Sequence, residues 1–301
     1  MLDLITYDVF TETPFLGNPL AIVPQADGLS TGQMQTLARE LNLSETIFVM
    51  RPENPANTAR VRIFFPKAEI PFAGHPTIGC AIHLSGLADA QDDATIEMIL
   101  EEKAGPVPVT IRRAQGRVTA EFTAPLLPTR LRRMSDKALT ADALGLDQGD
   151  IGNAICALPE VWQAGPDYLL VPVASHAALS RCRPSGAAWD RLTLQAGTIS
   201  AWLFVPGAEH TFRARMFSPA GGTPEDPATG SAVVTFAGLL AQQGYYAAPA
   251  IPGIQVTQGA EMGRRSIIHA RVEMNGAKLT AVRIAGSAVR MSHGRMRIPC
   301  Q

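Results

Sequence analysis

The chain has 301 residues, a formal net charge of -1 and 46% hydrophobic residues. This length predicts about two domains, and the composition is that of a globular protein that builds its own hydrophobic cores. The balanced charge gives no electrostatic attraction to nucleic acid or to an anionic membrane surface, so neither is an expected partner. The four cysteines contain no CxxC pair, so neither a disulfide framework nor a zinc site is predicted.

The N-terminal segment, MLDLITYDVF, lacks the basic start of a signal peptide and carries acidic residues within its apolar stretch. No apolar run is long enough to cross a bilayer. Together with the scattered cysteines, these features predict a protein of the reducing cytoplasm.

The first half of the chain reads as strand, helix, strand, strand, glycine turn and apolar helix. In chain order, the predicted elements are a strand at 16–23, a helix at 31–41, strands at 44–50 and 60–66, and a helix at 73–87. The last of these helices is apolar nearly all round, which is typical of a helix buried inside a sheet. Gly74 at its start permits a tight turn and a close approach of the backbone.

The same order of elements recurs in the second half. Its clearest mark is the string R-x-R-[IM]-F-x-P, which stands at 60–66 and again at 213–219. The other predicted counterparts are a strand at 152–158, a helix at 187–195, a strand at 198–205, and a helix at 229–244. Two sheets, each wrapped around one central helix, account for this repeat. We expect the arginines of both copies to lie on the solvent or cleft face of their strands.

The boundary between the two lobes is predicted near residues 120–127, where the sequence has the proline density of a linker. The first lobe would cover residues 1–122 and the second lobe residues 123–282. The tail at 283–301 has the alternating pattern of a strand, and we expect it to return to the first lobe.

The two predicted helix starts form a candidate binding site. The first N–H groups of a helix lack internal partners and carry the positive end of the helix dipole. Two such starts facing one cleft would bind a carboxylate or a developing enolate oxyanion. Matching the helix lengths pairs Gly74 and His75 with Gly230 and Ser231, and Asp226 precedes the second start. Each polar residue alone is explained as well by a helix cap or a turn. Their convergence on two equivalent turns favours a functional interpretation.

Glu45 stands at the mouth of an apolar, β-prone run, where a glutamate is unfavourable. Aligning SETIFVM with SAWLFVP places Ala201 opposite Glu45, so the strand itself does not require an acid. A satisfied structural carboxylate is an equal alternative. A single base would suit an allylic or tautomeric isomerisation, in which one carboxylate takes a proton from one atom and returns it to another. That role needs a raised pKa, which we expect from the apolar neighbours Ile47 and Phe48.

Five motifs resemble those of the phenazine-biosynthesis PhzF-like isomerases: GNPLAIV, NLSETIFV, FPKAEIPFAGHPTIG, SPAGGTPEDPATGSA and GAEMGRRS. The resemblance covers essentially the whole chain. It implies the diaminopimelate epimerase-like α+β fold, with two pseudo-symmetric lobes, each a sheet or barrel around a central helix, and the active site between them. It also implies chemistry without a cofactor or metal on a small cyclic or amino carboxylic acid, often in a homodimer.

The resemblance also implies roles for individual residues. Glu45 would shuttle the proton, and His75 and Asp226 would be the further catalytic residues. Substrate binding would fall to Gly74, Gly230, Ser231 and Asn18. In the related epimerases, cysteines hold two base positions; Ala73 and Thr229 stand there in this sequence, which argues against a two-thiol epimerase.

Two other functions stay open from the sequence alone. Ser231, His75 and Asp226 are the residue types of a hydrolase triad. However, the serine lies in TGSAV rather than in a G-x-S-x-G motif, and a triad would leave Glu45 without a role. A ligand-binding protein without catalytic activity would retain the same cleft.

Overall fold

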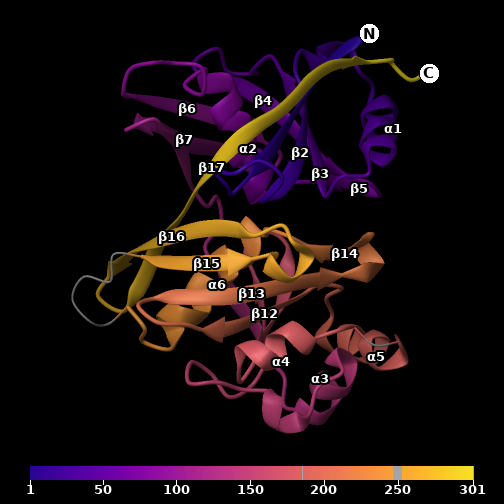
Figure 1. The fold of residues 1–301 in the computed structure, drawn as a ribbon, viewed down its shortest axis with the longest axis vertical. Helices are drawn as coiled ribbons and strands as arrows, with labels where there is room; N and C mark the ends of the chain where they lie inside the picture. The colour runs from indigo at the N-terminus through magenta and orange to yellow at the C-terminus, as the bar shows by residue number, and fades with distance from the viewer. Residues whose placement is uncertain (185, 247–252, 301) are drawn as a thin grey trace. The chain divides into compact units, whose positions relative to one another are not determined.

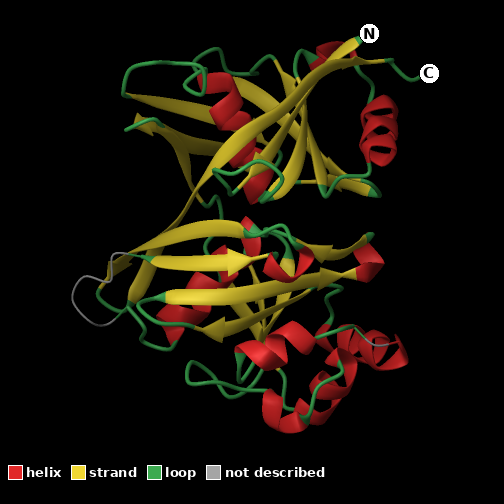
Figure 2. Ribbon diagram, in the orientation of Figure 1, coloured by secondary structure: helices red, strands yellow, loops and turns green. Residues whose placement is uncertain are grey.

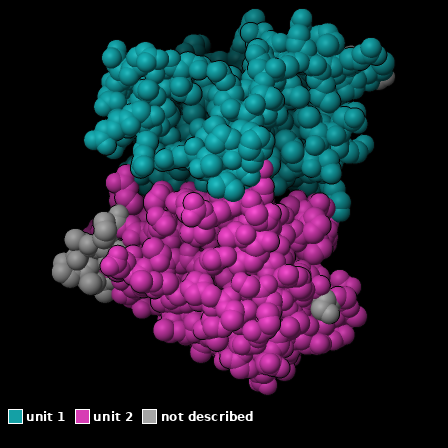
Figure 3. Space-filling view, in the orientation of Figure 1, with its two compact units in different colours: residues 1–125, 283–301 teal, residues 126–282 magenta. Residues whose placement is uncertain are grey.

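A computed structural model of the chain describes residues 1–184, 186–246 and 253–300. The chain forms two compact units, which Figure 3 colours separately. Unit 1 contains Met1–Pro125 together with Arg283–Gln301, and unit 2 contains Leu126–Val282. In the described part of the chain, no helix is long and apolar enough to cross a membrane.

Unit 1 is a closed β-barrel around one helix (Figure 1, Figure 2). Its barrel strands are β1 (Leu2–Val9), β2 (Asn18–Val23), β3 (Glu45–Met50), β4 (Ala59–Phe65), β6 (Ala94–Glu102), β7 (Gly105–Ala114), β8 (Arg117–Thr123) and β17 (Lys278–Met296). Each strand pairs with the next in this order, and β17 pairs back with β1, which closes the barrel. The short strand β5 (Ala68–Ile70) forms a hairpin with β4.

The central helix of unit 1 is α2 (Gly74–Ser85), and it contacts β1, β2, β3, β6, β7 and β8. Its first nine residues are all buried, as an apolar helix inside a barrel requires. A Cβ added at Gly79 would lie 2.5 Å from the Leu20 side chain, so glycine allows the helix to approach the strands closely. Helix α1 (Thr31–Leu41) begins with a capping box at Ser30 and packs on β3 and β4.

Unit 2 repeats this plan around α6 (Gly230–Gln242), which contacts β9, β10, β11 and β16. Its strands are β9 (Thr129–Arg133), β10 (Glu160–Gln163), β11 (Asp167–Pro172), β12 (Ala201–Pro206), β13 (Thr211–Ser218), β14 (Thr223–Asp226), β15 (Ile254–Gln258) and β16 (Ser266–Asn275). Its other α-helices are α3 (Lys137–Leu144), α4 (His176–Arg181) and α5 (Gly186–Ala196). Among these, α5 packs with α3 and α4 packs with β12, and residues of all four elements belong to one separate hydrophobic cluster.

The four predicted helices are confirmed as α1, α2, α5 and α6, as is the arrangement of a sheet around a helix in each repeat. The strand predicted at 152–158 is wrong, because this segment is a loop. The side-chain oxygen of Asn153 accepts hydrogen bonds from the backbone N–H groups of Ile155 and Cys156, and Gly152 has a φ of 113°. The strand that pairs in parallel with β12, as β2 pairs with β3, is β11.

The structure shifts the predicted alignment of the two repeats by one residue. In unit 1, Thr46 pairs with the phenylalanine of the R-x-R-x-F string; in unit 2, Ala201 pairs with the corresponding phenylalanine. Ala201 therefore corresponds to Thr46, and Ser200 corresponds to Glu45. A shift of one residue moves a side chain to the other face of a strand, so the pairing decides this correspondence.

The arginines of the repeat do not all face solvent or a cleft. The guanidinium of Arg215 is 2% exposed, makes a two-pronged ion pair with Glu225, and donates to three carbonyl oxygens at the end of α4. Arg62 makes the same two-pronged pair with Glu69 but is 23% exposed. The prediction is thus wrong for Arg215, whose hydrogen-bonding groups serve the fold of unit 2.

Candidate active site

The site of unit 1 is built around a carboxylate and an imidazole. Glu45 is the first residue of β3 and His75 the second residue of α2, and Glu45 Oε2 lies 3.2 Å from His75 Nδ1. The His75 side chain is 3% exposed and that of Glu45 is 19% exposed. Burial lowers the pKa of His75 to about 3, so the imidazole is neutral at physiological pH. Its contact with Glu45 is therefore a close approach of a carboxylate to a neutral imidazole rather than an ion pair.

Asn18 completes this group of predicted residues. It is the first residue of β2, it is fully buried, and its Nδ2 lies 3.3 Å from His75 Nδ1. The parallel pairing of β2 with β3, in which Leu20 stands opposite Glu45, brings the beginnings of both strands to the start of α2. The Nδ1 atom accepts from the Asn18 amide when it carries no proton, and His75 also makes a hydrogen bond with the backbone of Pro19.

The apolar surroundings of Glu45 differ from the prediction. Side chains alternate along a strand, so Ile47 lies on the same face as Glu45 and Phe48 lies on the opposite face. Phe48 packs edge to face on Phe64, with ring centroids 5.5 Å apart, in the cluster beneath α1. The expectation that Phe48 flanks the carboxylate is wrong.

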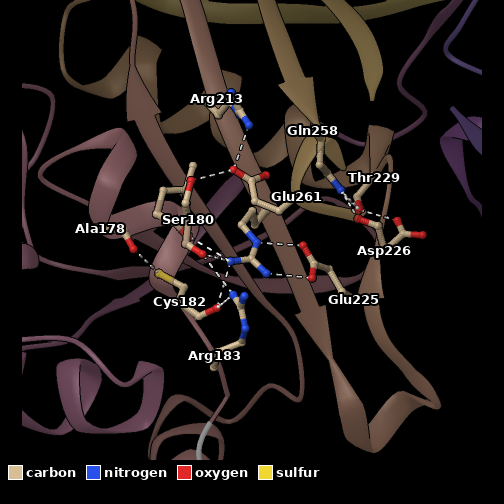
Figure 4. Close-up of polar contacts among 12 residues, drawn as sticks. Ala178, Ser180, Cys182, Arg183, Arg213, Glu225, Asp226, Thr229, Gln258 and Glu261 are labelled. Atoms are coloured by element: carbon tan, nitrogen blue, oxygen red, sulfur yellow. Dashed lines mark hydrogen bonds and ion pairs between the residues drawn. The ribbon is translucent and has the colours of Figure 1, made fainter. Parts of the chain in front are cut away.

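The equivalent helix start in unit 2 holds a chain of hydrogen bonds (Figure 4). The Gln258 amide donates to the Thr229 hydroxyl over 2.9 Å and to the Asp226 carbonyl oxygen over 2.8 Å. The Thr229 hydroxyl in turn donates to the carboxylate of Asp226 over 2.5 Å. All three side chains are buried. The carboxylate of Asp226 is thus an acceptor at the turn that leads into α6.

Ser231, the second residue of α6, lies with its Oγ 2.8 Å from the hydroxyl of Tyr168. Both side chains are buried. The partner of Ser231 is therefore a phenol and not the imidazole that a Ser-His-Asp triad requires. This partner therefore gives no support to Ser231 as the nucleophile of a hydrolase.

Several polar residues at these helix starts were missed by the sequence analysis, chiefly Tyr168, Gln258 and Glu102. Two of them carried a usable signal, because they end strands whose alternate residues are apolar and buried. Glu102 follows Met98 and Leu100 on the inward face of β6, and Gln258 ends the inward series of β15. Among the residues that the structure describes, no three His, Cys, Asp or Glu side chains are grouped to hold a metal ion.

Comparison with known proteins relates the whole chain to one family. Residues 7–294 match the PhzC-PhzF family, described as phenazine biosynthesis-like protein. An uncharacterized isomerase of Mesorhizobium japonicum is 42% identical over 98% of each chain. The trans-2,3-dihydro-3-hydroxyanthranilate isomerase of Pseudomonas aeruginosa is 37% identical over 97% of this chain and 98% of its own.

Solved structures share the fold. A predicted epimerase of Pseudomonas aeruginosa superposes with a TM-score of 0.82 at 28% identity, covering 98% of this chain and 99% of its own. A probable proline racemase of Agrobacterium radiobacter superposes with a TM-score of 0.64 at 12% identity, over 99% of this chain and 94% of its own. The second likeness concerns the fold alone. The predicted diaminopimelate epimerase-like fold is confirmed.

Proposed function

Because the chain belongs to the PhzC-PhzF family of phenazine biosynthesis-like proteins and is an isomerase, we propose that it moves a proton within a small cyclic or amino carboxylic acid, with Glu45 as the single acid and base. The observation that supports this most directly is the 3.2 Å approach of the Glu45 carboxylate to the buried imidazole of His75. The reaction would need no cofactor, because a carboxylate alone both accepts and returns the proton.

The proposed step is an allylic proton transfer. Glu45 Oε1 takes a proton from a ring carbon, and the electron pair of the broken C–H bond moves into the neighbouring unsaturated system. The protonated Glu45 exchanges its proton with solvent and then gives a proton to another carbon on the same face of the substrate. His75 holds Oε2 from its Nδ1 side, which orients the carboxylate and leaves Oε1 to carry the proton.

The neutral state of His75 suits this shuttle. A protonated imidazole beside Glu45 would form an ion pair that stabilises the carboxylate and slows its protonation by the substrate. Because burial lowers the pKa of His75 to about 3, no such charge is present at neutral pH. The imidazole therefore positions Glu45 without fixing it in one protonation state.

Substrate binding is proposed for Gly74, Gly230, Ser231 and Asn18, and Asp226 is proposed as a further catalytic group. Helix starts supply backbone N–H donors for a substrate carboxylate, since α2 and α6 both begin without a side-chain cap. The P. aeruginosa relative is named for a dihydro-hydroxyanthranilate, which carries both an amino and a carboxylate group. A compound of this class is the first substrate to test. A homodimer and a cytoplasmic location stay predictions from the sequence.

The direct experiment replaces Glu45 by glutamine. Incubating trans-2,3-dihydro-3-hydroxyanthranilate with the Glu45→Gln variant in D2O should show isomerisation and deuterium incorporation slowed by roughly 10²–10⁴-fold, the usual contribution of a positioned general base. Glu40→Gln, an exposed position at the end of α1, is the matched control and should retain the wild-type rate.

Circular dichroism and calorimetric binding of the product should be unchanged in Glu45→Gln, since the amide has the shape of the acid. Exchange at the wild-type rate in this variant would refute the role of Glu45. If the wild type does not turn over this compound, a panel of cyclic and α-amino carboxylic acids, with the same variant as control, identifies the substrate class.

A further inference from the structure

Glu102 is a buried carboxyl group near the start of α2 that the proposed reaction does not use. It is the last residue of β6, it is 7% exposed, and its Oε1 lies 2.6 Å from Thr77 Oγ1. Thr77 Oγ1 also lies 2.7 Å from the carbonyl oxygen of Ala73, the residue that caps α2. A hydroxyl has a single hydrogen, so Thr77 cannot donate fully to both oxygens. Both contacts are satisfied when Glu102 carries a proton and donates it to Thr77.

The repeat allows Glu102 to be compared with the residue at the corresponding position of unit 2. The first arginine of each R-x-R string pairs in parallel with Glu101 in unit 1 and with Thr257 in unit 2. Glu102 therefore corresponds to Gln258. Both residues end a strand with their side chains directed inward, and both contact a threonine at the start of the central helix.

Gln258 is neutral, and its amide is fully used. It donates to Thr229 Oγ1 and to the Asp226 carbonyl oxygen, and it accepts from the indole N–H of Trp202 over 2.9 Å. A protonated carboxyl group has one O–H donor and one carbonyl acceptor, so it imitates an amide, whereas a carboxylate offers only acceptors. The correspondence with Gln258 thus favours the neutral acid at Glu102.

We propose that Glu102 is held as a neutral carboxylic acid that positions the start of α2. Its O–H donates to Thr77, and the Thr77 hydroxyl then donates to the Ala73 carbonyl oxygen, two residues before His75. Glu102 is a positioning residue, because it acts on the substrate only through the helix start that carries His75. This inference rests on the proposed role of Glu45 and His75.

The surroundings of Glu102 agree with a neutral state. Besides Thr77, the group of α2 that interacts with Glu102 is the thiol of the buried Cys80, and the residue opposite Glu102 on β7 is Gly105, which has no side chain. The neighbouring Glu101 and Lys103 lie at the surface, on the other face of the chain. Burial raises the pKa of Glu102 to about 8, and the Thr77 hydrogen bond offsets only part of this rise.

Raising the pH ionises Glu102 and reverses the hydrogen bond of Thr77. The hydroxyl then turns towards the carboxylate, and the Ala73 carbonyl oxygen loses its donor. With a pKa of about 8, the neutral form is reduced about tenfold at pH 9. We expect kcat of the wild type to fall by about this factor between pH 7 and pH 9.

The test compares kcat against pH for the wild type, Glu102→Gln and Glu101→Gln. Glu102→Gln installs the amide of unit 2, so its kcat should be near the wild-type value at pH 7 and should persist at pH 9. Glu101→Gln, at a partly exposed side chain on the other face of β6, should keep the wild-type decline. A decline in Glu102→Gln equal to that of the wild type would overturn the inference.

The protonation state of Glu102 can also be tested by unfolding experiments, which need no measurement of enzyme activity. The folded-state pKa of Glu102 lies above its ordinary value of 4.5, so the unfolded chain releases this proton first. Stability should therefore be lost as the pH rises from about 5 to about 8, and Glu102→Gln should not share this loss. Equal pH dependence of the urea midpoints in both proteins would contradict a neutral Glu102. This result is independent of Glu45, so a failure of the proposed function would be recognised separately by an active Glu45→Gln.

Discussion

Helix α2 of unit 1 and helix α6 of unit 2 both begin at a glycine, and each has a polar residue in second place. In unit 1 that residue is His75, which contacts the carboxylate of Glu45. In unit 2 it is Ser231, which contacts the hydroxyl of Tyr168, and Ser200 stands where unit 1 has its acid. The repeat therefore determines where a helix begins, while a few strand positions determine whether a carboxylate lies beside the second residue of that helix.

After Glu45→Gln itself, the largest effect on kcat should come from removing the imidazole of His75. We expect His75→Ala to lower kcat by roughly 10²-fold, because Glu45 loses the group that orients it. His83→Gln is the matched control, since His83 lies on the same helix, half-buried, with its Nδ1 3.3 Å from the hydroxyl of Tyr7. Steady-state kinetics measure the difference. Equal losses in the two variants would mean that His75 acts only through the stability of α2.

The next prediction compares how much stability the protein loses when the arginine of each ion pair, Arg215–Glu225 or Arg62–Glu69, is removed. Arg215→Ala removes a buried guanidinium, so Glu225 loses its cation and the carbonyl oxygens at the end of α4 lose their donor; breaking a buried pair typically costs about 3–5 kcal/mol of unfolding free energy. Arg62→Ala removes the corresponding pair with Glu69 at a partly exposed site, where about 1 kcal/mol is usual. Urea denaturation of both variants measures the difference. Similar costs would show that burial does not distinguish the two pairs.

A smaller loss of stability is expected from Gln258→Glu, which places the acid of unit 1 at the corresponding position of unit 2. Gln258→Glu removes one of the two amide hydrogens that serve Thr229 and the Asp226 carbonyl oxygen. A buried group left without its partner costs about 1–3 kcal/mol, so this variant should be less stable at pH 7, whereas Glu102→Gln should not be. Thermal unfolding of the two variants side by side measures this. If the Gln258→Glu protein were as stable as the wild type, the prediction that an acid is tolerated at position 102 but not at position 258 would be wrong.

The sequence predicted the parts of the fold that depend on local pattern. Helices that are apolar nearly all round are buried, and glycines mark where they begin, so α2 and α6 follow from composition and period. The candidate residues Glu45, His75 and Asn18 do come together in unit 1, although their roles stay proposals.

What the sequence did not predict depends on pairing between distant segments. Ser200 and Ala201 are both small, so only the pairing of β12 with β13 shows which of them corresponds to Glu45. Tyr168 lies on β11. The sequence prediction had assigned the place of β11 in the repeat to a strand at 152–158, so Tyr168 was not considered. Its contact with Ser231 joins residues 63 positions apart, a relation for which the local pattern holds no signal.

The smallest effect concerns the hydrogen bond between Tyr168 and Ser231. Tyr168→Phe removes one hydroxyl of a neutral pair, which costs about 0.5–1.5 kcal/mol of stability, and leaves the Ser231 hydroxyl in place. If the start of α6 binds the substrate and the start of α2 transfers the proton, this variant should raise KM several-fold and leave kcat unchanged. Ser231→Ala should raise KM at least as much, because it removes the proposed ligand itself. A fall in kcat with unchanged KM in either variant would place proton transfer at both helix starts, and the contrast between His75 and Ser231 would then be lost.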